Sequence, residues 1–310
     1  MISAATAVRT TPAPRRRGAW REALRFGEGM LYLLPAFVVF AAFVFYPLFK
    51  SMRLSLYITD ILGQAQVYVG IQQYRDIFAS GAFGDSLAIT ALFTLYTVIP
   101  SIAVSLVLAL MANWKLRGVS FFRMVFSSPI VVAVASASMI WMMLYSPAQG
   151  VLNYLLSLLR IPPVNWLADP RWALPAVSIV AVWRSLGFNT ILLLSGIQSI
   201  SEDIYESARI DGAGPWTMFR RITLPLLSPV LMFLVITSTI NALQSFGEIN
   251  ILTAGGPAGA TNVVVYSIYR EAFFNFNFGF AVAEAMVLFA IILALTVTQF
   301  ALFERRVFYQ

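Results

Sequence analysis

Six apolar runs dominate this sequence, and each is long enough to cross a lipid bilayer as a helix. The hydrocarbon core of a bilayer is about 30 Å thick and a helix rises about 1.5 Å per residue, so about 20 apolar residues span it. Of the 310 residues, 59% are hydrophobic and 11% are charged, whereas soluble domains carry about 25% charged residues. We therefore predict an all-α membrane protein with six transmembrane helices, near residues 30–49, 86–111, 124–145, 172–196, 229–251 and 278–302.

Lysine and arginine are distributed unevenly among the segments that join these spans. With the N-terminus inside the cell, fourteen of the 21 basic residues fall in cytoplasmic segments, six fall outside and Arg184 lies in a span. Because basic loops stay on the cytoplasmic side, we expect a multi-pass protein of the inner (plasma) membrane with both termini in the cytoplasm. Residues 1–29 are expected to form a disordered basic tail. Residues 30–302 form the membrane domain, with a cytoplasmic loop at 197–228, and residues 303–310 form a C-terminal tail.

The residue types that most enzymes use are missing. The chain has no cysteine and no histidine, which excludes thiol nucleophiles, imidazole bases and most zinc and haem sites. It has no phosphate-binding Gly-x-x-x-x-Gly-Lys-Ser/Thr loop, because neither Lys50 nor Lys115 follows a glycine. We expect no catalytic residue, no metal site and no cofactor in this chain. Nucleic acid is not an expected partner, because the basic residues flank apolar spans rather than forming a soluble basic face.

The loop between the fourth and fifth spans is predicted to form two short helices around a charged turn. Ser201 is a suitable N-cap, and the carboxylates of Glu202 and Asp203 favour the positive end of a helix dipole. Gly212 can adopt the left-handed conformation that ends a helix, and Pro215 fits the first turn of the next one. Such an elbow can insert into a groove on another protein. The alternative is an ordinary solvated loop whose acids only cap a helix.

The same loop resembles the EAA loop of ABC-importer permeases. Three segments carry the resemblance at the family's spacing: Glu206-Ser207-Ala208, Asp211-Gly212-Ala213 and Ile222-Thr223-Leu224-Pro225, with Ser207 where the family usually has Ala. The resemblance implies the type I permease fold, in which this loop is a coupling helix seated in the cleft of an ATPase subunit. The residues to which it assigns ATPase coupling are Glu206, Ser207, Ala208, Asp211, Gly212, Ala213, Leu224 and Pro225. We expect Leu224-Pro225 to end the second helix of the loop.

Three ionisable residues fall inside the predicted spans: Arg184 in the fourth, Glu248 in the fifth and Glu284 in the sixth. Each costs about 2.5–3.5 kcal/mol on insertion scales, so each calls for a reason. A pair between Arg184 and Glu248 inside the helix bundle is one economical arrangement. A packing role and a role on a translocation path both remain open for these residues.

The fifth span is the most polar. If it is one continuous helix, then Asn241, Gln244, Ser245 and Glu248 share one face of it. A polar stripe beside the aromatic Phe246 suits a sugar, whose hydroxyl groups need donors and acceptors; interhelical hydrogen bonding is the alternative. In the maltose-type relatives of the family the matching segment contacts substrate, and Gln244 and Ser245 fall on those positions.

Other segments narrow the resemblance to the sugar-permease branch. Residues 68–75 resemble its FVGLxNY loop, residues 252–257 its LTxGGP signature, and residues 305–310 its basic ending in Tyr-Gln. Residues 151–159 are too short to span a membrane and are predicted to form a helix at the outer surface.

Taken from about residue 30 to the end, the resemblance implies a transport subunit rather than an enzyme. It would form half of the path for a carbohydrate, a sugar or oligosaccharide, in an ATP-binding-cassette importer. The expected partners are a second homologous permease, two ABC ATPase subunits that use ATP, an extracytoplasmic solute-binding protein and the lipid bilayer. Glycerol 3-phosphate is the alternative cargo. An ion-coupled secondary transporter could use the intramembrane acids as ion sites, but such a transporter has no evident use for a loop that docks on another protein.

Overall fold

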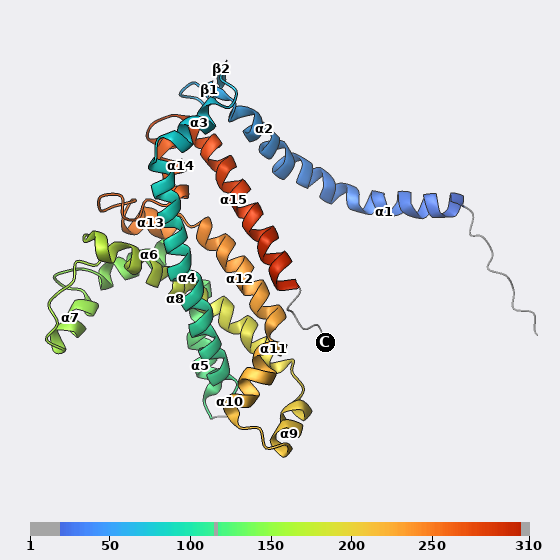
Figure 1. Cartoon of the computed structure of the whole chain (residues 1–310), viewed down its shortest axis with the longest axis vertical. Coiled ribbons are helices and arrows are strands. Elements are labelled where there is room, and N and C mark those ends of the chain that lie inside the picture. Colours follow the sequence, from blue (N-terminus) through green and yellow to red (C-terminus); the bar gives the residue numbers. More distant parts are fainter. Residues whose placement is uncertain (1–18, 115–116, 305–310) are drawn as a thin grey trace, which may run out of the picture. The chain divides into compact units, whose positions relative to one another are not determined.

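The computed structural model describes residues 19–114 and 117–304, and the chain divides into two compact units, Met1–Ser51 and Met52–Gln310 (Figure 1). In the first unit, α1 (Ala19–Phe40) continues through a π-helical turn (Ala41–Phe45) into α2 (Tyr46–Leu54), which crosses the boundary between the units. The stretch Gly29–Leu54 is long and apolar enough to span a membrane, and none of its most apolar window is buried within this chain.

The predicted disordered tail is wrong for its last eleven residues, because α1 begins at Ala19. Alanine, arginine, glutamate and leucine have high helix propensity, and they make up most of Ala19–Leu24. The basic character of the segment concealed this preference. Residues 1–18 and 305–310, which include the predicted C-terminal signature, lie outside the described residues.

In the described part of the second unit, the regular elements are helices and one hairpin. Its elements are β1 (Tyr57–Thr59), β2 (Ala65–Tyr68), α3 (Gln72–Ala79), α4 (Ala82–Ala112), α5 (Val119–Ser127), a 3₁₀ turn (Ser128–Val131), α6 (Val134–Leu144), α7 (Val151–Leu158), α8 (Pro170–Gln198), α9 (Glu202–Ile210), α10 (Pro215–Met218), a π-helical turn (Phe219–Thr223), α11 (Leu224–Leu226), α12 (Ser228–Leu243), α13 (Gly247–Leu252), α14 (Val264–Phe273) and α15 (Phe278–Glu304). Within this unit α4 runs from the end that carries the hairpin to the end that carries α10 (Figure 1).

Continuous helices account for four of the six predicted spans. Among the described residues, the stretches long and apolar enough to cross a membrane are Gly29–Leu54, Ala82–Ala112, Pro170–Gln198 and Phe278–Phe303. Six are reached only if two bent helix pairs each count as one span: Val119–Val131 with Val134–Leu144, bent by 107°, and Pro215–Leu226 with Ser228–Leu243, bent by 64°. The third and fifth spans are therefore not the uninterrupted helices that hydropathy predicts.

The third span breaks where two serines and a proline follow one another. α5 ends at Ser127, Pro129 opens a short 3₁₀ turn, and the backbone is extended at the two residues before α6. The long helix α8 lies against this break at Gly187. A Cβ atom on Gly187 would lie 2.8 Å from the carbonyl oxygen of Ser127 and 3.1 Å from the backbone nitrogen of Ile130. Only a glycine allows this approach of two backbones.

The fifth span breaks after Leu243, and α13 begins at Gly247. The prediction that Asn241, Gln244, Ser245 and Glu248 share one face of a continuous helix is therefore wrong. Asn241 belongs to α12, Gln244 and Ser245 lie in the break, and Glu248 is in the first turn of α13. The reason is tertiary: α13 turns away from α12 and packs against α6 and α8.

The core of the second unit lies along α4 and α8, which form its most extensive helix pair. Phe93 of α4, Val177 of α8 and Ile249 of α13 are fully buried in one cluster with Tyr145. The Tyr145 hydroxyl donates a hydrogen bond to the carbonyl oxygen of Ala176 at 2.8 Å. A buried phenol needs such a partner, and this one fixes the end of α6 to α8.

The segment between α2 and α3 forms the antiparallel β1–β2 hairpin, which the sequence did not predict. Its turn is organised by Asp60, whose carboxylate accepts hydrogen bonds from the backbone amides of Gln64 at 2.7 Å and Leu62 at 3.0 Å. The hydrogen bond from Gln64 contributes most to a lowered pKa of Asp60. The Thr59 hydroxyl then accepts a hydrogen bond from the backbone amide of Gly279 at 3.0 Å, which ties the hairpin to the start of α15.

We expect Gly187→Ala to destabilise the protein, because the added methyl group meets backbone atoms that cannot rotate aside. Overpacking of this kind costs about 1–3 kcal/mol. Thermal unfolding in detergent measures the effect as a lower Tm. The matched control is Gly84→Ala, the same change at a helical glycine with no neighbouring atom within 4 Å, where the Tm should stay or rise slightly. Equal melting temperatures for the two variants would show that α8 does not approach the break this closely.

Candidate functional site

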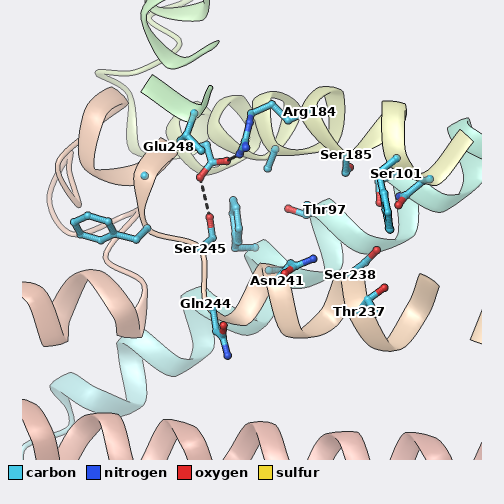
Figure 2. Close-up of a pocket in the computed structure, with 18 residues that line it drawn as sticks. Thr97, Ser101, Arg184, Ser185, Thr237, Ser238, Asn241, Gln244, Ser245 and Glu248 are labelled. Carbon is cyan, nitrogen blue, oxygen red and sulfur yellow. Dashed lines mark hydrogen bonds and ion pairs between the residues drawn. The ribbon is translucent and has the colours of Figure 1, made fainter. Parts of the chain in front are cut away.

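A cavity of about 510 Å³ lies where α4, α8, α12 and the start of α13 meet. Figure 2 shows that its polar side chains come from all four elements. The polar residues that line it are Thr97 and Ser101 of α4, Arg184, Ser185 and Asn189 of α8, Thr237, Ser238 and Asn241 of α12, Gln244 and Ser245 of the break, and Glu248 of α13. Phe93, Phe188 and Phe246 add aromatic surface. The cavity therefore combines hydroxyl, amide and aromatic groups with one cation and one anion.

An ion pair holds the cavity side of α8 to α13. Arg184 Nη1 contacts Glu248 Oε1, and the Ser245 hydroxyl donates to the second carboxylate oxygen of Glu248 at 3.1 Å (Figure 2). The Arg184 side chain is 28% exposed and the Glu248 side chain 7%. The structure thus contains the pair that the sequence suggested. The arginine is the more accessible partner, and the carboxylate is the buried one.

All four path residues predicted in the fifth span line the cavity, although they reach it from different elements. Gln244 points away from the ion pair (Figure 2), and Asn241 and Gln244 are exposed whereas Glu248 is buried. The break in the helix is therefore what gathers these side chains around one space. A continuous helix would have presented them as a single stripe.

Three buried atoms of lining residues have no hydrogen-bond partner within the described part of the chain: Thr97 Oγ1, Arg184 Nε and Asn189 Nδ2. Thr97 and Asn189 are 8% and 2% exposed as whole residues. A buried polar atom without a partner costs about 1–3 kcal/mol. The wall of the cavity therefore contains polar groups whose hydrogen-bonding capacity the described residues do not use.

Sequence reasoning missed six of the polar lining residues: Thr97, Ser101, Ser185, Asn189, Thr237 and Ser238. A signal was present, because Thr97 and Ser101 are four residues apart, as are Ser185 and Asn189. That spacing places each pair on one face of a helix. Uncharged polar residues are common in membrane helices, so the spacing gains its meaning only when the helices are known to face one space.

Glu284, the third intramembrane charge, does not line this cavity. It is 3% exposed on α15, and Ser267, Arg270 and Glu271 of α14 are its polar neighbours. The structure therefore separates it from Arg184. Its surroundings are those of a helix contact, because α14 and α15 pack extensively against each other.

The loop between α8 and α12 forms the helix, turn and helix that its sequence predicts. The Ser201 hydroxyl accepts a hydrogen bond from the backbone amide of Asp203 at 3.3 Å. At the other end of α9, Gly212 has a φ of +79°. The amides of Gly212 and Ala213 bond the carbonyl oxygens of Arg209 and Ala208 at 3.1 and 2.9 Å. This pair of bonds is a Schellman motif, which explains the glycine.

The second helix of the loop does not end at Leu224-Pro225, so that prediction is wrong. α10 passes into the π-helical turn Phe219–Thr223 and then into α11, which contains Pro225 near its start. A proline lacks the amide that an α-helix would use. Here the hydrogen-bond register has already changed in the π-helical turn, so the chain continues to Leu227 before it bends.

A side-chain bond joins the two halves of the loop. The hydroxyl groups of Tyr205 on α9 and Thr223 in the π-helical turn lie 3.0 Å apart. Thr223 is 5% exposed, so the bond is sheltered from water. Other side chains of the loop are open to solvent: Glu206 is exposed, and the apolar side chains of Ile210 and Trp216 are 87% and 70% exposed.

Comparison with known proteins defines the class to which this fold and cavity belong. Residues 86–309 match the family described as "Binding-protein-dependent transport system inner membrane component". The chain belongs to this family, so it is a multi-pass transport component of the inner membrane.

Relatives and a solved structure agree with this assignment. The chain is 33% identical over 282 residues to the sn-glycerol-3-phosphate transport system permease protein UgpA of Agrobacterium fabrum, covering 90% of this chain and 95% of the relative. It is 34% identical over 270 residues to the trehalose/maltose transport system permease protein MalF of Thermococcus litoralis, covering 87% and 91%. A chain of a bacterial ABC transporter involved in the import of the acidic polysaccharide alginate superposes with a TM-score of 0.80 and 24% identity, covering 92% and 98%. That likeness shows a shared fold.

We expect Tyr205→Phe to loosen α9 from the segment that leads to α12. Loss of one net hydrogen bond of about 1 kcal/mol raises the population of the open loop about fivefold. Limited trypsin digestion after Arg209 reads this out as faster cleavage in detergent-solubilised membranes. Tyr154→Phe, at a 64% exposed tyrosine of α7, is the matched control and should leave the cleavage rate unchanged. Unchanged cleavage of the Tyr205→Phe variant would show that the bond does not hold the loop.

Proposed function

We propose that this chain is the permease subunit that forms half of the translocation path of an ABC importer for a carbohydrate. An extracytoplasmic solute-binding protein delivers the sugar or oligosaccharide, and separate ATPase subunits dock on residues 202–225 and use ATP. A second, homologous permease completes the path. The single observation that carries this proposal is the polar cavity built around the break in the fifth span, in a chain of the binding-protein-dependent transport family.

The chemistry of the cavity suits a sugar. Sugar hydroxyl groups both donate and accept hydrogen bonds, so they pair with the hydroxyl and amide groups of Thr97, Ser238 and Asn241. Aromatic rings such as Phe93 and Phe246 offer flat apolar surface to the faces of a sugar ring. A volume of about 510 Å³ is in the range of small-molecule sites. The relative named for trehalose and maltose supports the same cargo class.

The arrangement in the membrane follows from the distribution of charge. The excess of basic residues in the segments around residues 1–29, 112–123 and 197–228 favours a cytoplasmic location for both termini and for the α9–α10 loop. The exposed Glu206, Ile210 and Trp216 would then face the ATPase. The hairpin and α7 would face the binding protein outside.

Glycerol 3-phosphate is a second candidate cargo, because several relatives are named for it and Arg184 lines the cavity. The pairing of Arg184 with Glu248 weakens this candidate, since the carboxylate repels a phosphate. An ion-coupled secondary transporter is disfavoured by membership of a binding-protein-dependent family.

We expect Thr97→Val to lower transport without lowering stability. The substitution keeps the shape of the side chain and removes a buried hydroxyl that has no partner among the described residues, so the folded protein loses no hydrogen bond. Thr190→Val is the matched control, because Thr190 is also buried with an unpartnered hydroxyl but does not line the cavity. Uptake into proteoliposomes should fall severalfold for Thr97→Val alone, at unchanged Tm. Equal uptake by both variants would remove Thr97 from the path.

Charge reversal by Glu206→Lys should uncouple ATP hydrolysis from transport while leaving membrane insertion intact. Glu206 is exposed on α9, so its loss should not unfold the chain, and surface substitutions usually change stability by less than about 0.5 kcal/mol. Uptake and ATPase activity are measured together in proteoliposomes. Glu206→Asp keeps the charge and serves as the control. Normal uptake by Glu206→Lys would exclude this surface as the docking site.

Co-purification tests the proposed function as a whole. The tagged chain, solubilised from its membrane, should bring with it an ATPase and a second permease. The ligand of the accompanying binding protein should be a carbohydrate. A stable chain that purifies alone and supports ion-driven uptake would overturn the proposal.

A further inference from the structure

We propose that the Arg184–Glu248 pair sets the charge selectivity of the cavity, with Glu248 acting as a built-in counter-ion that keeps the site open to neutral cargo and closed to anions. The inference rests on the proposed function, in which the cavity is part of the cargo path. It assigns Glu248 a specificity role, and it states what its removal should do: convert the cavity into one that favours phosphorylated or carboxylated cargo.

The first observation is the charge balance of the cavity. Of the described residues that line it, Arg184 and Glu248 are the only ionisable ones, and all the others are hydroxyl, amide, aliphatic, aromatic or glycine residues. The formal charge of the lining is therefore zero. A change at either residue alters that charge by a full unit, and no other lining group can compensate.

The second observation is the order in which the two charges lie. The Arg184 side chain is four times as exposed as that of Glu248, at 28% against 7%. Glu248 has both carboxylate oxygens engaged, one by Arg184 and one by Ser245. A guanidinium carries five N–H donors, and Nη1 is the nitrogen of Arg184 that bonds Glu248. Both residues line the cavity, and the guanidinium is the more exposed of the two charged groups and keeps N–H donors that Glu248 does not use.

Electrostatics makes this arrangement selective. Two unit charges a few ångströms apart interact strongly in a medium of low effective dielectric constant. A carboxylate in direct contact with Arg184 cancels most of the field that an incoming anion would feel. A neutral sugar is indifferent to this cancellation and can still accept hydrogen bonds from the guanidinium.

The competing explanation is structural: the ion pair joins α8 to α13 and only holds these two helices together. However, α13 also packs against α6, and Ile249 beside Glu248 is fully buried in the core. The position of α13 is therefore supported by apolar contacts as well. The two explanations predict different behaviour when the charges are removed together.

The test uses the absence of native cysteine. In the assembled complex, Ser238→Cys places one thiol on the cavity wall. Its reaction rates with two methanethiosulfonate reagents of opposite charge, the ethylsulfonate and the ethyltrimethylammonium forms, report the local potential. Four backgrounds are compared: unchanged, Glu248→Gln, Arg184→Gln and the double variant. Protection of the thiol by glucose and by glucose 6-phosphate is then measured in each.

The expected result follows the charge of the lining. Glu248→Gln should raise the anion-to-cation rate ratio on the order of tenfold, Arg184→Gln should lower it, and the double variant should restore it. Protection should shift from glucose towards glucose 6-phosphate in Glu248→Gln alone.

If the anion-to-cation rate ratio is the same in all four backgrounds and all variants are folded, the selectivity role of the pair is wrong and the proposed function still stands. If the double variant assembles no complex, the ion pair is needed to hold the structure together and the inference fails. If neither sugar protects the thiol in any background, the cavity is not on the path, and the proposed function fails first.

Discussion

Backbone amides and carbonyls cannot be left without partners in a bilayer, and this constraint decides where the helices of this protein can be interrupted. Irregular backbone at membrane depth is tolerated only where it is buried in protein or lines a cavity. α6 begins at Val134 after the break in the third span, and α13 begins at Gly247 after the break in the fifth. Both residues line the same cavity. The two interruptions and the polar space are therefore one feature of the fold.

The cavity and the loop that contains α9 and α10 are joined by one stretch of chain. From Pro215 the chain continues through the π-helical turn and α11 to the bend at Leu227, and from there α12 leads to Asn241 on the cavity wall. The Tyr205–Thr223 bond attaches α9 to the last residue of the π-helical turn in this run. The segment that contacts α9 and the cavity wall are thus joined by consecutive helices with one bend of 64° between them.

The sequence was sufficient for the approximate limits of the four spans that form continuous helices, because hydropathy reports the length of apolar chain directly. It also predicted the cap at Ser201 and the left-handed turn at Gly212, which depend on neighbouring residues only. The breaks depend on contacts with distant helices: Gly187 of α8 against the third span, and α6 against α13. The prediction of a polar face on a straight fifth helix therefore included Gln244 and Glu248. It did not include Thr97 and Asn189, which reach the cavity from other helices.

The most direct test of the central claim, that this cavity is the cargo path, is its accessibility during the ATP cycle. Asn241→Cys, in a chain without other cysteines, is exposed to a membrane-impermeant thiol reagent in the assembled importer. We predict that its reaction rate differs by an order of magnitude or more between the resting complex and the complex trapped with ATP and vanadate. Thr298→Cys, outside the cavity on α15, should react at one rate in both states. Equal rates at position 241 in the two states would contradict the account.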